Sequence, residues 1–368
     1  MSVFTAKSFR NHEHVLFHQD PASGLRAIIA IHDTTLGPAL GGCRYWHYDN
    51  DEAALEDALR LSRGMTFKAA LANLAFGGGK AVIMAPANDD PNDSGAGGGM
   101  TRARFQAFGR FVDSLGGRYI TAEDVGTSPL DLEIVHGVTP YVAGVADGGA
   151  GDGDPSPATA WGVFHGLKAA GLAALGRNEL HGVHVAVQGL GHVGGYLAEH
   201  LAEAGAVLTV ADLDESRLRW AKSNLGANVV AVDAIYDVPA DIFAPNAMGA
   251  VLNDDTISRL SVRAVAGSAN NQLAEDRHGR AMAARGILYA PDYVINAGGI
   301  INISHEGRTY DRDAAMNHCA QIHGTLAEIF QRAGREGRPT NEIADQLAEE
   351  RIAAHVTAEI RRLHAVVG

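Results

Sequence analysis

The segment at residues 183–212 constrains the fold more than any other part of the sequence. An apolar run at 183–188 leads into the glycine-rich sequence GLGHVG at 189–194, then a helical pattern to about Ala204 and a second apolar run that ends at Asp212. The first glycine allows a tight turn, the second lets the backbone approach a pyrophosphate, and the third lets helix and strand pack closely. This order predicts a Rossmann-like domain that binds a dinucleotide, whereas the glycines alone would fit an ordinary turn. The residues expected at the dinucleotide are Gly189, Leu190, Gly191, His192, Val193 and Gly194.

The acid at the end of the second apolar run indicates which dinucleotide binds. Asp212 is placed to accept hydrogen bonds from a ribose 2′-hydroxyl, and its negative charge would repel a 2′-phosphate. NAD is therefore favoured over NADP. Arg217 and Arg219 lie close by in the sequence and leave the strictness of this preference open.

The length of 368 residues exceeds what one ordinary core supports, so we expect two α/β domains. Residues 147–155 (DGGAGDGDP) are typical of a linker, and beyond them helices and strands alternate as in a parallel sheet. We predict a first domain at 1–146, for substrate and oligomer contacts, and an NAD-binding domain at 147–337. The segment 338–368 contains a helix that we expect to return to the first domain.

Charge and composition exclude several kinds of partner. The formal net charge of −13 argues against nucleic acid and anionic membranes, because phosphate binding needs clustered lysine and arginine. Two cysteines without a CxxC pair favour neither a disulfide framework nor a metal site. No signal-peptide pattern is present, and no apolar run reaches the ~20 residues of a membrane span, so we predict a cytoplasmic protein.

The first domain contains three residues that could take part in binding or catalysis. Apolar strands are predicted at 25–31 and 80–84, a helix from Glu52 to about Met65, and a surface loop at 88–99. Lys80 follows a predicted glycine turn, where partial desolvation would suit a general base. Lys68 could hold a carboxylate, and Asp124 could shuttle protons. Spacing alone supports only a nicotinamide-dependent oxidoreductase, because most isolated lysines are solvated surface residues.

Several ordered segments resemble the glutamate/leucine/phenylalanine/valine dehydrogenase family, and the resemblance covers nearly the whole chain. Within the family, the sequence is most similar to the shorter branch that includes leucine dehydrogenase. The segments are LGPALGGCR at 36–44, DALRLSRGMTFK at 57–68, GGGK at 77–80, TAEDVGT at 121–127, PSPATA at 155–160, GSANNQL at 267–273 and PDYVINAGG at 291–299.

The resemblance implies a role for each matched residue. Lys80 matches the lysine that activates water to attack an iminium, Lys68 the lysine that holds the α-carboxylate, and Asp124 the acid that exchanges protons with the amino group. Thr159 matches a threonine that contacts the cofactor near the hinge. The implied substrate-binding residues are Leu40, Gly41, Gly42, Met65, Lys68, Ala122, Asn271, Ile300 and Ile303, of which Asn271 also approaches the nicotinamide. A homo-oligomer, dimer or octamer, and a cleft that closes during turnover are implied as well.

The implied pocket is apolar. Leu40 stands where glutamate-specific members carry a lysine, and Ala122, Ile300 and Ile303 offer no partner for a second carboxylate. The expected reaction is therefore the NAD-dependent, reversible deamination of an apolar L-amino acid to the 2-oxo acid and ammonia. Leucine, valine and isoleucine are favoured, but Asn270 resembles phenylalanine-type members and keeps an aromatic substrate open. Asn246 and the segment ISHEG at 303–307 depart from the family pattern and leave contacts at the cofactor edge open.

Two further functions remain as alternatives. An NAD-binding protein without catalysis is disfavoured because Lys68, Lys80, Asp124 and Asn271 are all present. A 2-hydroxy-acid dehydrogenase would need a histidine general base. None of the seventeen histidines stands in a recognisable catalytic dipeptide.

Overall fold

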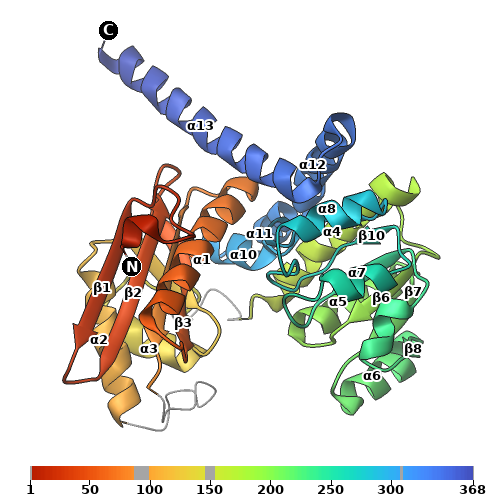
Figure 1. Cartoon of the computed structure of the whole chain (residues 1–368), viewed down its shortest axis with the longest axis horizontal. Helices are drawn as coiled ribbons and strands as arrows, with labels where there is room; N and C mark the ends of the chain where they lie inside the picture. Colours follow the sequence, from red (N-terminus) through yellow and green to blue (C-terminus); the bar gives the residue numbers. More distant parts are fainter. Residues whose placement is uncertain (1, 87–98, 146–153, 307–309, 368) are drawn as a thin grey trace. The chain divides into compact units, whose positions relative to one another are not determined.

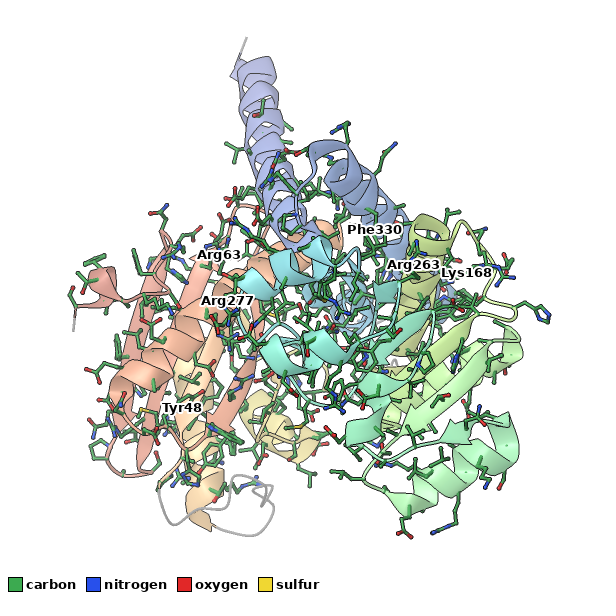
Figure 2. All side chains as sticks on the ribbon, turned by 45° about the vertical axis from the view of Figure 1, so that its right-hand side comes forward. Tyr48, Arg63, Lys168, Arg263, Arg277 and Phe330 are labelled. Carbon is green, nitrogen blue, oxygen red and sulfur yellow. The ribbon has the colours of Figure 1, made fainter. Side chains whose placement is uncertain are left out.

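The computed structural model describes residues 2–86, 99–145, 154–306 and 310–367. The chain divides into two units, shown with their elements in Figure 1. The first contains Met1–Gly153, Glu306–Thr309 and Glu349–Gly368, and the second contains Asp154–His305 and Tyr310–Ala348. Figure 2 draws the side chains, with Arg63 in the first unit and Arg277 in the second. Nearly all of the predicted loop at 88–99 and of the predicted linker at 147–155 lies outside the described residues.

The first unit is built on a five-stranded mixed sheet in the order β1-β2-β4-β3-β5. Strands β1, β2 and β4 pair antiparallel, whereas β3 pairs parallel with both β4 and β5. The elements are β1 (His14–Asp20), β2 (Leu25–Asp33), β3 (Ala39–Trp46), α1 (Asp51–Leu71), β4 (Gly77–Met84), α2 (Gly99–Asp113), β5 (Tyr119–Glu123) and α3 (Pro129–His136).

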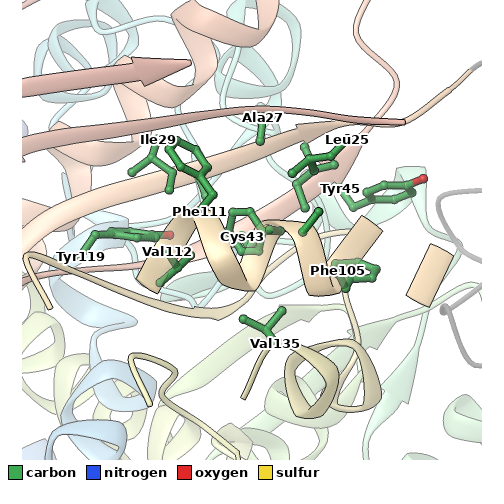
Figure 3. Packing of buried hydrophobic residues seen from close by; sticks show 14 of the residues in the cluster. Leu25, Ala27, Ile29, Cys43, Tyr45, Phe105, Phe111, Val112, Tyr119 and Val135 are labelled. Carbon is green, nitrogen blue, oxygen red and sulfur yellow. The ribbon is translucent and has the colours of Figure 1, made fainter. Parts of the chain in front are cut away.

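The alternation of side chains along the strands gives this sheet two buried faces. Ile29 of β2 packs in one cluster with Phe108 and Phe111 of α2, whereas Ile28 packs in another cluster with Leu59 of α1. Figure 3 shows the first cluster, with Phe111 against Ile29. Helix α1 therefore covers one face of the sheet and α2 the other.

The prediction of a glycine turn before Lys80 was wrong, because Gly77 to Gly79 form the first part of strand β4. Close packing explains these glycines. A Cβ at Gly78 would lie 2.1 Å from the backbone nitrogen of Thr66 in α1, and a Cβ at Gly79 would lie 2.6 Å from the ring of Tyr119. Helix α1 continues to Leu71, beyond the predicted end near Met65.

The second unit contains a parallel sheet in the order β11-β10-β9-β6-β7-β8. Counted along the chain, this is the order 6-5-4-1-2-3 of dinucleotide-binding sheets, with the switch point between β6 and β9. The strands are β6 (His184–Gln188), β7 (Val207–Ala211), β8 (Asn228–Val229), β9 (Ile242–Pro245), β10 (Ala264–Val265) and β11 (Leu288–Tyr289). The helices are α4 (Ser156–Leu175), α5 (His192–Glu203), α6 (Glu215–Leu225), α7 (Asp254–Arg259), α8 (Arg277–Ala284), α9 (Asp292–Ile295), α10 (Gly298–Ser304), α11 (Arg312–Ala320) and α12 (Ile322–Glu336).

The last helix, α13 (Thr340–Val367), begins in the second unit and ends in the first. Arg351 Nη1 donates hydrogen bonds to the carbonyl oxygens of Ala70 (3.3 Å) and Leu71 (3.0 Å) at the end of α1. The C-terminal helix thus returns to the first unit, as expected. The units divide within α13 after Ala348, whereas the predicted domains divide before residue 338. Within the described ranges, no helix is long and apolar enough to cross a membrane.

Candidate active site

Lys80 and Asp124 form an ion pair in the first unit. Lys80 lies on β4, Asp124 follows the last residue of β5, and Lys80 Nζ is 2.8 Å from Asp124 Oδ2. The Lys80 side chain is 5% exposed and the Asp124 side chain 22%. The second carboxylate oxygen, Oδ1, has no partner among the residues that the structure describes. The pair is therefore nearly dry but keeps one acceptor open.

Glycines in β3 allow this pair to form across the strand that separates β4 from β5. A Cβ at Gly42 would lie 2.7 Å from Asp124 Cβ, so a side chain there would displace the carboxylate. A Cβ at Gly41 would lie 1.7 Å from the carbonyl oxygen of Gly79 on β4. The hydroxyl of Tyr119 donates to the Gly41 carbonyl at 2.6 Å and fixes the strand from β5. Steric crowding thus explains why glycine stands at both predicted positions, Gly41 and Gly42.

Strand register brings the predicted apolar residues of this unit onto the same face. Gly42 is paired with Ala122, and Leu40 is paired with Gly78, two residues before Lys80. Because side chains alternate along a strand, Leu40, Lys80, Ala122 and Asp124 all belong to the face that α1 covers. Leu40 and Ala122 are buried, so this face offers apolar surface beside the ion pair.

Met65 and Lys68 lie three residues apart on α1, so they share a side of the helix, and both are half-buried. Thr66 between them packs against Gly78 of β4. The sheet, the residue that follows β5, and α1 thus carry all the predicted residues of this unit: Leu40, Gly41, Gly42, Met65, Lys68, Lys80, Ala122 and Asp124.

Opposed influences act on the pKa of Asp124. Burial, the largest of them, raises this pKa, but the cations of Lys80 and Arg44 outweigh it and the pKa is lowered. Asp124 is therefore a carboxylate at neutral pH. Burial raises the pKa values of the neighbouring Cys43 thiol and Tyr119 phenol, so both groups are neutral there.

The glycine-rich segment of the second unit has the features that a dinucleotide requires. Gly189 has φ of +89°, a conformation that favours glycine, and a Cβ at Gly194 would lie 2.1 Å from the Gly189 carbonyl oxygen. A Cβ at Gly191 would meet only Arg217 Nη1, at 3.9 Å, which leaves open space above the N-terminus of α5. The residues present therefore fit a bound pyrophosphate. The neighbouring Leu190 is buried, Val193 is half-buried and His192 is exposed.

Asp212 follows β7 and is held by backbone groups. Its carboxylate accepts hydrogen bonds from the N–H groups of Leu190 (2.6 Å) and Asp214 (2.8 Å). Arg217 and Arg219, which leave the strictness of the NAD preference open in the sequence, have acidic partners in Asp214 (3.6 Å) and Glu215 (3.3 Å). Asp212 thus lies beside the glycine-rich segment, whereas the two arginines pair with Asp214 and Glu215 instead.

Asn246, which departs from the family pattern, joins the ends of β9 and β10. Its Oδ1 accepts hydrogen bonds from the backbone N–H (2.9 Å) and the hydroxyl (2.8 Å) of Ser268. Asn270 Oδ1 accepts a bond from Asn296 Nδ2 at 2.8 Å. The side-chain oxygens of both asparagines thus have partners within this edge of the sheet.

The remaining predicted residues lie on other parts of the second unit. Asn271 is exposed, with φ of +52°, and its N–H donates to the carboxylate of Asp292. Ile300 and Ile303 lie on α10 and are buried and half-buried. Thr159 of α4 lies against the start of this helix, because a Cβ at Gly299 would be 3.1 Å from Thr159 Oγ1.

Sequence reasoning missed the residues that surround Asp124. Arg44 Nε is 2.9 Å from Asp124 Oδ2, and Arg44 Nη1 is 2.8 Å from Asp57 Oδ2. The Asp124 backbone N–H donates to Thr127 Oγ1 at 2.9 Å. The period of two along a strand could have indicated Arg44, because it lies two residues after Gly42.

Comparisons with known proteins agree with this arrangement. Residues 12–141 match the family description "Glu/Leu/Phe/Val dehydrogenase, dimerisation domain", and residues 210–363 match "Glutamate/Leucine/Phenylalanine/Valine dehydrogenase". A leucine dehydrogenase of Thermoactinomyces intermedius is 50% identical, over 96% of this chain and 94% of the relative. A phenylalanine dehydrogenase of Bacillus thermotolerans is 47% identical, over 96% and 92%.

Solved structures share the fold. The crystal structure of L-tryptophan dehydrogenase from Nostoc punctiforme superposes with a TM-score of 0.82 at 46% identity, over 94% of this chain and 97% of that chain. The predicted fold class and the predicted family are confirmed. The chain belongs to the glutamate/leucine/phenylalanine/valine dehydrogenase family.

Proposed function

We propose that this protein catalyses the reversible, NAD-dependent oxidative deamination of an apolar L-amino acid to the 2-oxo acid and ammonia. The observation that carries the proposal is the buried Lys80–Asp124 pair, with Nζ and Oδ2 2.8 Å apart. An amine and a carboxylate held in contact in an apolar setting can move protons to and from a reacting amino group.

The reaction divides into proton steps at these two groups. Asp124 takes a proton from the substrate ammonium group, and hydride loss from the α-carbon then leaves an iminium. Lys80 releases its ammonium proton to solvent and then takes a proton from the water that attacks the iminium carbon, which gives a carbinolamine. Asp124 returns its proton to the nitrogen, and collapse releases ammonia, the 2-oxo acid and the hydroxyl proton.

NAD⁺, when bound, supplies the hydride acceptor. We assign its pyrophosphate to the segment 189–194 and its ribose to Asp212, with Thr159 and Asn271 as further contacts. The preference for NAD rests on the Asp212 carboxylate beside Leu190. Lys68 is assigned to the substrate α-carboxylate, with Gly41, Gly42 and Met65 beside the substrate.

The substrate side chain is proposed to be aliphatic and branched, as in leucine, valine and isoleucine. Leu40 and Ala122 offer only apolar surface beside the ion pair, and Ile300 and Ile303 are apolar as well. An unpaired glutamate carboxylate would lose several kcal/mol in such surroundings. Leucine dehydrogenases at 48–50% identity support this choice.

An aromatic amino acid is the second candidate. Asn270 favours it in the sequence, and relatives named phenylalanine and L-tryptophan dehydrogenase are 44–47% identical to this chain. One methylene in an apolar pocket changes discrimination by only ~1–3 kcal/mol, so both classes can react at different rates.

The assembly is proposed to be a homo-oligomer, dimer or octamer, in the cytoplasm. The first matched segment belongs to a family description that names a dimerisation domain, which supports self-association.

The Lys80→Ala variant tests the proposal. It should abolish NADH formation from leucine while the dissociation constant for NAD⁺ stays within twofold of wild type, because Lys80 belongs to the other unit. Lys7→Ala, which removes an exposed lysine of the same unit, should retain full activity. Deamination that persists without Lys80 would refute the assigned role.

A further inference from the structure

Arg44 links the Asp124 carboxylate to helix α1. Its guanidinium contacts Asp124 Oδ2 through Nε (2.9 Å) and Asp57 Oδ2 through Nη1 (2.8 Å). The Arg44 side chain is only 18% exposed, so its charge is largely removed from water. A buried charge of this kind is stable only when it is paired, and here both partners are carboxylates.

Asp57 is itself fixed by other residues. The Tyr48 hydroxyl donates to Asp57 Oδ2 at 2.8 Å, and Arg60 Nη2 donates to Asp57 Oδ1 at 3.0 Å. Tyr48, labelled in Figure 2, lies in the connection between β3 and α1. Asp57 therefore anchors the far end of Arg44, and the guanidinium can hold Asp124 in one orientation.

The two oxygens of Asp124 are used unequally. Oδ2 accepts bonds from both Lys80 Nζ and Arg44 Nε, while Oδ1 has no partner within the described part of the chain. Without Arg44, the carboxylate could rotate and exchange its oxygens at Lys80. Thr127 fixes only the backbone of Asp124, so it does not prevent that rotation.

We propose that Arg44 is a positioning residue, which holds Asp124 by Oδ2 and keeps Oδ1 available for the amino group of the substrate. This inference rests on the proposed deamination. The residue type is suited to the role, because a guanidinium presents Nε and Nη1 in a fixed fork that reaches two carboxylates at once. A lysine offers one compact ammonium and can satisfy only one of them.

The charges around Asp124 predict a signature in the pH profile. Lys80 on β4 and Arg44 on β3 are the cations that lower the pKa of Asp124, and the neighbouring Cys43 and Tyr119 are neutral. Removing the Arg44 charge should therefore raise the pKa of Asp124. The acid limb of kcat/KM, where protonated Asp124 can no longer accept a proton, should move to higher pH.

The test compares Arg44→Gln and Arg44→Lys with wild type, with leucine and NAD⁺ as substrates. Arg44→Gln should lower kcat at least tenfold and move the acid limb upward. Arg44→Lys, which restores the charge but not the fork, should return the limb toward its wild-type position with kcat only partly recovered. Both variants should bind NAD⁺ as wild type does, because the dinucleotide residues belong to the second unit.

Two further variants keep the test decisive. Arg26→Gln removes an exposed arginine of β2 that pairs with Asp51 at the start of α1, at 2.7 Å, and should change neither kcat nor the pH profile. Tyr48→Phe removes one hydrogen bond to Asp57 and should lower kcat by less than Arg44→Gln does. If Arg44→Gln does not fold, the kcat of Tyr48→Phe tests the role of Arg44.

The outcomes separate the inference from the proposed function. A wild-type protein that forms no NADH with any amino acid would overturn the proposed function and the inference with it. An active wild type with unchanged kcat and acid limb in Arg44→Gln, or unchanged kcat in Tyr48→Phe, would overturn the role of Arg44 alone. An equal loss in Arg44→Lys and Arg44→Gln, without a shift of the limb, would indicate a purely structural role.

Discussion

Substitution of Gly78 by alanine should separate α1 from the sheet that carries Lys80. A Cβ at this position would lie 2.1 Å from Thr66 N, 2.2 Å from Thr66 Oγ1 and 2.5 Å from Ser62 O. Two of these atoms belong to the backbone of α1, so they cannot rotate away. The helix must therefore shift as a body, together with Met65 and Lys68.

The size of the effect follows from the cost of overpacking. One extra methyl group in a close-packed core costs about 1–3 kcal/mol, and we expect the upper end because backbone atoms are involved. For a unit of this size, each kcal/mol lowers the thermal midpoint by about 2–4 °C, so the midpoint should fall by about 6–12 °C. The KM for the amino acid should rise, because Lys68 moves with the helix.

Gly64→Ala is a matched control on the same helix. A Cβ at Gly64 would meet nothing within 4 Å, and alanine is favoured over glycine in a helix by about 1 kcal/mol. Scanning fluorimetry should therefore show a higher midpoint for Gly64→Ala and a lower one for Gly78→Ala. Equal midpoints for Gly78→Ala and wild type would refute the close packing of α1 on β4.

Two further predictions concern the cofactor and acid stability. Asp212→Ala should weaken NAD binding and reduce the preference for NAD over NADP, and unchanged kinetics with both dinucleotides would contradict that assignment. Burial, with the positive charges of His12 and Arg63, lowers the pKa of His32 from 6.5 to about 4. The unfolded chain binds this proton below about pH 6.5 and the folded chain only near pH 4, so stability should fall with pH in that window, by up to about 1.4 kcal/mol per pH unit. His32→Gln should reduce this slope in denaturant titrations between pH 7 and 4; an identical slope in the variant would count against a neutral, half-buried His32.

The dinucleotide-binding part of the fold could be predicted from local sequence because each of its features has a local cause. The turn at Gly189, the helix after Gly191 and the acid at the end of β7 follow one another within a single strand–helix–strand unit. Their spacing is fixed by covalent geometry and by the pyrophosphate that such a unit binds.

Other features depend on contacts between distant segments and could not be predicted in this way. Gly77 to Gly79 look like a turn in the sequence, but they are strand residues. The backbone at Asp33 leaves no room for a side chain at Gly77, and α1 and Tyr119 leave none at Gly78 and Gly79. Arg44 contacts Asp124 although 80 residues separate them in the sequence, and the strand order β4-β3-β5 brings them together. The division of α13 between the units likewise depends on contacts such as that of Arg351 with α1.

We propose that Lys80 and Asp124 deaminate an apolar amino acid in surroundings lined by Leu40 and Ala122. The most direct test of this proposal is the initial rate of NADH formation with NAD⁺ and, in turn, leucine, valine, isoleucine, phenylalanine, tryptophan and glutamate. We expect the highest kcat/KM for a branched-chain substrate and no reaction with glutamate. A higher kcat/KM for phenylalanine or tryptophan would contradict the assignment of the pocket. No NADH formation with any amino acid, by a protein that still binds NAD⁺, would contradict the proposed deamination itself.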